Sequence, residues 1–306
     1  MSTGELRGIF QIVHTAFFEN GEIDYDSIAR QVEFCRAGGV HGLVMPANAS
    51  EFFTLTDDER FRLVENLCTR ADPAMPVVVG VQAPTTKAAV TFAEHARQHG
   101  AAAVMAMPPY LRKAGGSVLK EYYRQIADVG LDVIIQNAPG PIGTPLAPSL
   151  VQELLSEHSN VSYLKEEVPP ILQRISFAVE NGGEHCRGVF GGANGLVIVE
   201  ELDRGACGNM PAGGVIDVQV ESYNAYQNGN RALAVDIQQR LMPLLFHAST
   251  YGVMFHKYIL WKRGVITTPT ARDPQAIHLD AHDRNIIHER WKEIAGFANS
   301  DYPLGG

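Results

Sequence analysis

Short apolar segments alternate with amphipathic ones along the first two thirds of the chain, and this alternation limits the fold more than any other feature. Helical periodicity marks residues 24–39, which end in two glycines, and residues 56–71, where Thr56 and Glu59 have capping-box spacing. The segments of buried-strand type are residues 8–15, 42–46, 76–81, 102–109, 132–139, 161–167, 188–192 and 206–212. The strands are too apolar to have a solvent-exposed face, and each is followed by a helix. This pattern predicts a closed parallel barrel with the helices outside.

An open, doubly wound sheet could be built from the same units. Its dinucleotide-binding form needs G-x-G-x-x-G after the first strand, and the segment "GGANG" at 191–195 does not match that pattern. After about residue 213 the strand signals cease and the chain reads as successive helices. We therefore expect an α/β fold, a (β/α)8 TIM barrel over residues 1–225, with a C-terminal helical region, residues 226–306, packed on it.

Composition argues against several classes of partner. The 306 residues carry a formal net charge of -9 with no basic run, which disfavours nucleic acid and anionic membranes. The N-terminal segment lacks a basic region followed by an apolar one, and we expect a cytoplasmic protein. The four cysteines are far apart, and His14 and His41 lack a third ligand at metal spacing, so neither a metal nor another cofactor is predicted.

The strand at 161–167 ends in three consecutive charges, which is unusual for a buried strand. Because side chains alternate along a strand, Tyr163, Lys165 and Glu167 share one face, whereas Leu164 and Glu166 share the other. Catalytic residues of TIM barrels lie at the carboxyl ends of the strands, where this pair falls.

Lys165 and Glu167 have two readings. They could form an inner ion pair that only holds strands together. Alternatively, Lys165 is a nucleophile on the inner face of the barrel, where its amine attacks a ketone to form a Schiff base. Polar residues at other strand ends, Gln136, Asn48 and Asn209, favour the second reading, because they would surround the same mouth of the barrel.

Several motifs together resemble the dihydrodipicolinate synthase/N-acetylneuraminate lyase superfamily of Schiff-base barrels. They are "MPANASEFFTLTDDER", "MPPY", "QNAP", "YLKEE" and a late "RDP", in the family's order and over nearly the whole chain. The loop motif G-T-T-G-E-x-x-x-L-x-x-x-E-R is matched by Ala47, Asn48, Ala49, Ser50, Glu51, Leu55, Glu59 and Arg60. The resemblance implies that Lys165 is the Schiff-base lysine and that the loop at 47–51 receives the substrate carboxylate. It also implies a homo-oligomer, the tetramer, and a small 2-keto acid as substrate.

The departures from the family motif indicate the reaction. Lyases and synthases of this family use two tyrosines and a loop threonine as a proton relay, and here those positions hold Gln136, Leu111 and Asn48. An amide cannot act as a general acid or base at neutral pH, so aldol cleavage loses its usual base. Glu167 remains, two residues beyond Lys165 on the same face, and a carboxylate there suits elimination.

The lysine, the two glutamates and the glutamine together are similar to the L-2-keto-3-deoxyarabonate dehydratase branch. That resemblance implies conversion of a 2-keto-3-deoxypentonate to 2-oxoglutarate semialdehyde and water, with Lys165 as nucleophile, Glu167 as proton shuttle and Gln136 orienting the departing hydroxyl. Asn194 and Asn209 are expected in the substrate pocket; "GGANG" binding a phosphate is the alternative use of that segment. Three other functions stay open: a deaminase of 1-pyrroline-4-hydroxy-2-carboxylate with the same product, a 2-keto acid aldolase, and a keto-acid sensor without activity.

Overall fold

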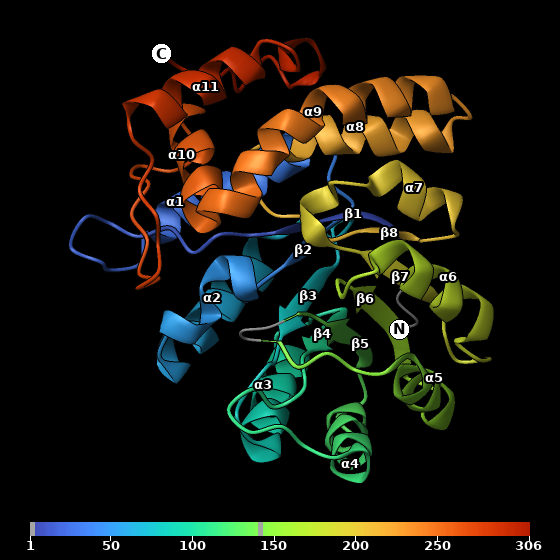
Figure 1. Cartoon of the computed structure of the whole chain (residues 1–306). Helices are drawn as coiled ribbons and strands as arrows, with labels where there is room; N and C mark the ends of the chain where they lie inside the picture. Colours follow the sequence, from blue (N-terminus) through green and yellow to red (C-terminus); the bar gives the residue numbers. More distant parts are fainter. Residues whose placement is uncertain (1–3, 140–142) are drawn as a thin grey trace.

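The computed structural model describes residues 4–139 and 143–306; the remaining positions of the expected domain 1–225 lie outside it. Eight parallel strands close into a barrel in chain order, and the predicted TIM barrel is confirmed (Figure 1). The strands are β1 Gly8–Ile12, β2 Gly42–Val44, β3 Val77–Gly80, β4 Ala103–Ala106, β5 Asp132–Asn137, β6 Val161–Glu166, β7 Gly188–Gly191 and β8 Gly208–Asn209. Each lies inside one of the eight segments that the sequence predicts.

Helices surround the barrel, and further helices follow its last strand (Figure 1). The barrel helices are α1 Tyr25–Ala37, α2 Asp57–Arg70, α3 Thr86–Gln98, α4 Gly116–Ala127, α5 Pro148–Glu157, α6 Ile171–Asn181, α7 Ile198–Asp203 and α8 Ile216–Gln227. Beyond them are α9 Arg231–Tyr251, α10 Val253–Lys262 and α11 Ala281–Trp291. The capping box at α2 is formed as expected, with Thr56 Oγ1 accepting from the Glu59 amide at 3.2 Å. The division between residues 225 and 226 stays a prediction.

Alternation along the strands separates two apolar layers. Tyr163 and Phe190 belong to the cluster inside the barrel, and Leu164 and Val189 belong to the larger cluster between the strands and the helices. Tyr163 and Leu164 therefore face opposite ways, as the sequence predicts for β6. A third apolar cluster joins α8 to α9, α10 and α11 and holds the C-terminal helices against the barrel.

Within residues 4–139 and 143–306, none of the helices is long and apolar enough to cross a bilayer.

Candidate active site

The carboxyl ends of β5 and β6 bring the three residues expected to be catalytic together. Gln136 and Lys165 are register partners on these adjacent strands. Lys165 is almost fully buried, and its Nζ lies 3.3 Å from Glu167 Oε1. The Gln136 side-chain amide donates to Glu167 Oε2 at 3.0 Å. One carboxylate is therefore held between an amine and an amide donor, with part of its surface open to solvent.

The glycine-rich segment after β7 closes against this carboxylate. The amide of Ala193 lies 3.4 Å from Glu167 Oε1. A Cβ at Gly192 would come 2.4 Å from Glu167 Cγ, so a larger residue there would displace the glutamate. Asn194 has a left-handed backbone, with φ 56°, and its carbonyl accepts from the Gln219 side chain. The structure thus places the segment beside Glu167, and Asn194 lies in the same loop.

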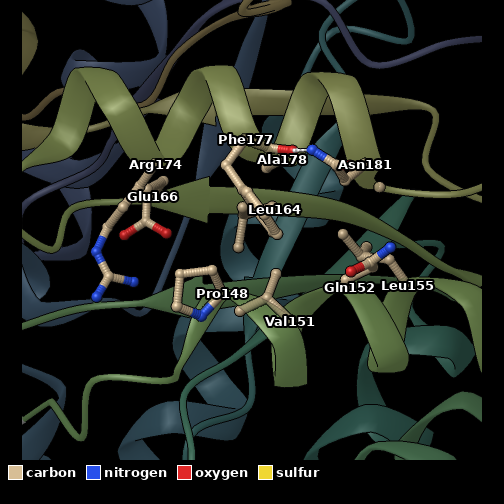
Figure 2. A pocket seen from close by; sticks show the side chains of 11 residues that line it. Pro148, Val151, Gln152, Leu155, Leu164, Glu166, Arg174, Phe177, Ala178 and Asn181 are labelled. Atoms are coloured by element: carbon tan, nitrogen blue, oxygen red, sulfur yellow. Dashed lines mark hydrogen bonds between the residues drawn. The ribbon is translucent and has the colours of Figure 1, made fainter.

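Glu166, although adjacent in sequence, lies on the outer face of the barrel. Figure 2 shows it with Leu164 and Arg174 in a small pocket between α5 and α6. Its carboxylate accepts from Asn137 Nδ2 at 2.8 and 3.1 Å and from the Val168 amide at 2.8 Å. Burial raises the pKa of the Glu166 carboxyl above its ordinary value, although these hydrogen bonds oppose the shift. The opposite orientation of the two glutamates agrees with the strand alternation.

The loop after β2 presents an unsatisfied helix start and an amide. Asn48–Ser50 form a single 3-10 turn, and the preceding residue, Ala47, provides no side-chain cap. The first N–H groups of such a turn, those of Asn48 and Ala49, have no acceptor within the turn itself, which suits them to an anion. Asn48 Nδ2 lies 3.8 Å from the Met107 sulfur. Its Oδ1 is buried and has no hydrogen-bond partner among residues 4–139 and 143–306.

Ser50 is occupied by contacts within the protein. Its hydroxyl donates to the Val13 carbonyl at 2.6 Å, and its own carbonyl accepts from Thr15 Oγ1 at 2.6 Å. The side chain is fully buried. Ser50, which we expected to contact substrate, therefore fastens the loop to the segment after β1, because its hydroxyl already has an acceptor.

Glu51 anchors the same loop to α10 and to the segment that follows α10. Its backbone is left-handed, with φ 57°, and its carboxylate pairs with the buried Lys257 of α10. The other oxygen accepts from the backbone amides of Arg272 and Asp273, each at 2.7 Å. The Arg272 guanidinium in turn binds both oxygens of Glu59, at 2.9 and 2.7 Å. The late "RDP" motif thus holds the loop motif in place. Lys257 was missed, since nothing in the helical tail marks it as the partner.

The two histidines near strand ends have structural partners. His14 packs against His256 of α10, with ring centroids 5.3 Å apart, and both are buried. Burial lowers the pKa of His14 well below its ordinary value and that of His256 to about 3, so both rings are neutral at pH 7. His41 Nδ1 accepts from the Ile9 amide at 3.2 Å.

Asn209 is the one expected pocket residue that faces away from the barrel interior. It is the register partner of Ile9, which belongs to the outer apolar cluster. Its Nδ2 donates to Glu201 Oε2 at 2.6 Å and to the Gly192 carbonyl at 3.1 Å. The structure therefore does not bring Asn209 to Lys165. The predicted segment 206–212, "ACGNMPA", shows no alternation of apolar and polar residues, so the sequence did not reveal which way Asn209 faces.

Glu201 on α7 is a buried acid that the sequence analysis missed. Burial raises the pKa of its carboxyl to about 8, and the negative charge of Glu167 adds to the shift. A Cβ at Gly191 would lie 2.0 Å from Glu201 Oε2, whereas one at Gly192 would meet Glu167. The two glycines thus separate an outer, protonated glutamic acid from the inner carboxylate. In the sequence "VIVEELD" Glu201 reads as an ordinary helix acid.

The sequence model of the dihydrodipicolinate synthetase family matches residues 5–292. The chain belongs to this family. Among curated relatives it is 31% identical to an L-2-keto-3-deoxyarabonate dehydratase from Azospirillum brasilense, covering 89% of this chain and 90% of that one. It is 30% identical to a 4-hydroxy-tetrahydrodipicolinate synthase from Methanothrix thermoacetophila, covering 78% and 80%.

Two further matches extend the comparison. A probable 2-dehydro-3-deoxy-D-pentonate aldolase, YjhH, from Escherichia coli is 28% identical, with 82% and 85% of the two chains covered. Among solved structures, dihydrodipicolinate synthase from Rhodopseudomonas palustris superposes with a TM-score of 0.86 at 26% identity, over 95% of this chain and 98% of that one. The protein is therefore an enzyme of this family, belongs to the lyase class and acts on a small molecule.

Proposed function

We propose that the protein is a Schiff-base dehydratase of a 2-keto-3-deoxy sugar acid, with L-2-keto-3-deoxyarabonate as substrate. The observation that carries the proposal is the contact of Glu167 with both Lys165 and Gln136, at 3.3 and 3.0 Å. A carboxylate stands beside the amine, and an amide replaces the family's tyrosine. The similarity to the Azospirillum brasilense dehydratase supports the same reading.

The reaction assigns one role to each side chain. Lys165 attacks the C2 ketone, water leaves, and the iminium makes the C3 protons acidic. Glu167 removes one of them, and the resulting enamine expels the C4 hydroxyl, which takes that proton from Glu167. Transfer of a proton from C5 to C3 then forms the terminal enol, which tautomerises to the aldehyde before water releases the product from Lys165. Gln136 orients the departing hydroxyl.

Unsatisfied acceptors near this cluster fit a hydroxylated substrate. Gln136 Oε1 and Asn48 Oδ1 are buried and have no hydrogen-bond partner within the described part of the chain. A buried acceptor without a donor costs free energy, about 1–3 kcal/mol, and substrate hydroxyls are donors that would remove this cost. The amides of Asn48 and Ala49, at the uncapped start of the 3-10 turn, would receive the carboxylate. Asn194 would contribute from the facing loop.

A product assay tests the proposal. The purified enzyme is incubated with a panel of 2-keto-3-deoxy acids and with 1-pyrroline-4-hydroxy-2-carboxylate, and semialdehyde, pyruvate and ammonia are measured. Semialdehyde without ammonia from a 2-keto-3-deoxypentonate is the expected result. Borohydride added during turnover should attach the substrate to Lys165, and an unlabelled lysine would contradict the Schiff base.

Aldol cleavage is the second candidate, favoured by the similarity to the probable pentonate aldolase of Escherichia coli. Pyruvate as the main product would establish it. Ammonia from the hydroxypyrroline would instead identify a deaminase. Neither outcome would follow from a protein that only senses keto acids, which would give no product and no borohydride adduct.

A homotetramer belongs to the proposal as well. Leu111, at the position of the tyrosine that family members lend to a neighbouring subunit, is 74% exposed beside Tyr110. A single exposed leucine is ordinary on a protein surface, so the tetramer rests on the family resemblance. Since Leu111 carries no proton, each site should depend less on assembly than in those members. Light scattering tests the state, and a monomer would contradict it.

A further inference from the structure

Three side chains of metal-ligating type meet on the outer surface of the barrel. Glu65 comes from α2, and His95 and His99 come from the last turn of α3 and the residue that ends it. Glu65 Oε1 lies 3.1 Å from His95 Nε2 and 3.8 Å from His99 Nε2. All three ligand atoms lie within 4.8 Å of one another.

The distances are close to those that a metal ion requires. Ligand atoms about 2.0–2.1 Å from a tetrahedral zinc ion are about 3.3 Å apart, so small side-chain rotations would complete the geometry. Histidines four residues apart share one face of a helix, which is the spacing of the zinc-binding histidines in H-E-x-x-H proteins. Their rings already lie together, with centroids 4.4 Å apart, and Phe61 packs against His95 at 4.6 Å.

We propose that Glu65, His95 and His99 form a site for a divalent transition-metal ion of the zinc type. Two imidazoles and one carboxylate are a donor set for zinc, nickel or copper, whereas magnesium and calcium prefer oxygen ligands alone. The carboxyl end of α3 carries a partial negative charge, which also favours a cation. The bound ion links α2 to α3 and leaves a coordination position for water.

The position of the site separates it from the catalytic chemistry. Barrel helices run opposite to the strands, so the carboxyl end of α3 lies at the end of the barrel remote from Lys165. The ion therefore stabilises the protein and takes no part in turnover. From the sequence, only the cysteines and the two histidines near strand ends were weighed as ligands, and the H-x-x-x-H spacing of His95 and His99 was not considered. Glu65 is 30 residues from His95, on another helix.

Calorimetric titration of the tag-free, chelator-treated enzyme with zinc tests the proposal. We expect saturable binding of one ion per chain and, at a hundredfold excess over Kd, a rise in Tm of roughly 3–6 °C. Magnesium should produce neither effect, and turnover should be the same with and without zinc. Absence of saturable binding would overturn the proposal and would leave Glu65 as a simple hydrogen-bond acceptor for His95.

Variants decide whether the ion binds at these residues. His99→Ala removes an exposed ligand and should weaken zinc binding at least about tenfold, and Glu65→Gln should act in the same direction. His185→Ala is the matched control, because His185 Nε2 lies 3.6 Å from Glu184 Oε1 but belongs to no such cluster among the described residues. Zinc affinity equal in the wild type and in His99→Ala would overturn the assignment.

Discussion

Charged side chains are buried both at the end of β6, where Lys165 lies beside Glu167, and in the anchor that Glu51 forms with Lys257. The two regions differ in whether the protein satisfies the polar atoms around those charges. In the anchor, the Glu51 carboxylate receives Lys257 and two backbone amides, so its oxygens are satisfied by the protein. Beside Glu167, Gln136 Oε1 is buried and lacks a partner within the described residues. In the anchor the protein itself satisfies both oxygens of Glu51, whereas beside Glu167 one buried acceptor is available to a ligand. The following variants test this distinction.

Lys165→Ala should have the largest effect, because it removes the only step that activates C2 in the proposed reaction. We expect no turnover above background in the product assay. Since Lys165 lies inside the barrel beside Glu167, its truncation should leave the far-ultraviolet circular dichroism spectrum unchanged. Substantial residual activity in a folded variant would refute the Schiff-base role.

Glu167→Gln keeps the size and polarity of the side chain but removes the group that carries protons. The value of kcat should fall by roughly 10²- to 10⁴-fold. Borohydride should still attach substrate to Lys165, since iminium formation precedes the proton transfer at C3. Near-normal dehydration by this variant would show that another group shuttles the proton.

Lys257→Met should affect stability more than chemistry. It leaves the buried Glu51 carboxylate without its charged partner, which costs roughly 3–5 kcal/mol of the free energy of unfolding. Urea denaturation measures the loss, and Glu51→Gln combined with Lys257→Met should recover part of it. A loss below about 1 kcal/mol would mean that solvent reaches the pair.

Acid should lower the free energy of unfolding through His256, which precedes Lys257 in α10. Its pKa is about 3 in the folded protein and near 6.5 when unfolded, so the unfolded chain binds one more proton between those values. Stability from this group is therefore complete above pH 6.5 and falls by about 1.4 kcal/mol per pH unit as the pH drops below it.

His256→Gln isolates that contribution. The difference in unfolding free energy between the wild type and the variant should shrink as the pH falls from 7.5 to 5, because only the wild type loses this group's contribution. Groups such as Glu201 are present in both proteins and largely cancel in the difference. His14 does not cancel fully, because His256 contributes to its lowered pKa. A difference independent of pH would contradict the lowered pKa.

The fold and the inner face of β6 could be read from the sequence because both follow from local alternation. Eight apolar runs predicted the barrel, and the period of two along β6 placed Lys165 with Glu167. Contacts between distant segments could not be read this way. Lys257 is 206 residues from Glu51, and its helix is apolar on every side, so periodicity does not reveal which residue is paired.

Asn209 shows a second limit. The segment 206–212 has no alternation of apolar and polar residues from which to infer its face. In the structure the Asn209 amide contacts Glu201 and Gly192 on the outer side of the barrel. Glu201 escaped notice for a related reason, since its raised pKa comes from burial that no local pattern reports. Sequence thus predicts the orientation of side chains on long, regular strands better than that of buried polar side chains between the strands and the helices.

Glu166→Gln should have the smallest effect and gives the sharpest comparison with Glu167→Gln. Glu166 faces α6, and its carboxylate accepts from Asn137 and Val168. Glutamine keeps one acceptor oxygen and replaces the other with a donor, which costs about 1 kcal/mol of stability where an amide now faces another donor. Because burial raises the pKa of Glu166, removal of its charge is partly compensated. The value of kcat should stay close to that of the wild type. If Glu166→Gln proved more damaging to turnover than Glu167→Gln, the outer carboxylate would be the proton carrier and the assignment of the inner face as catalytic would be wrong.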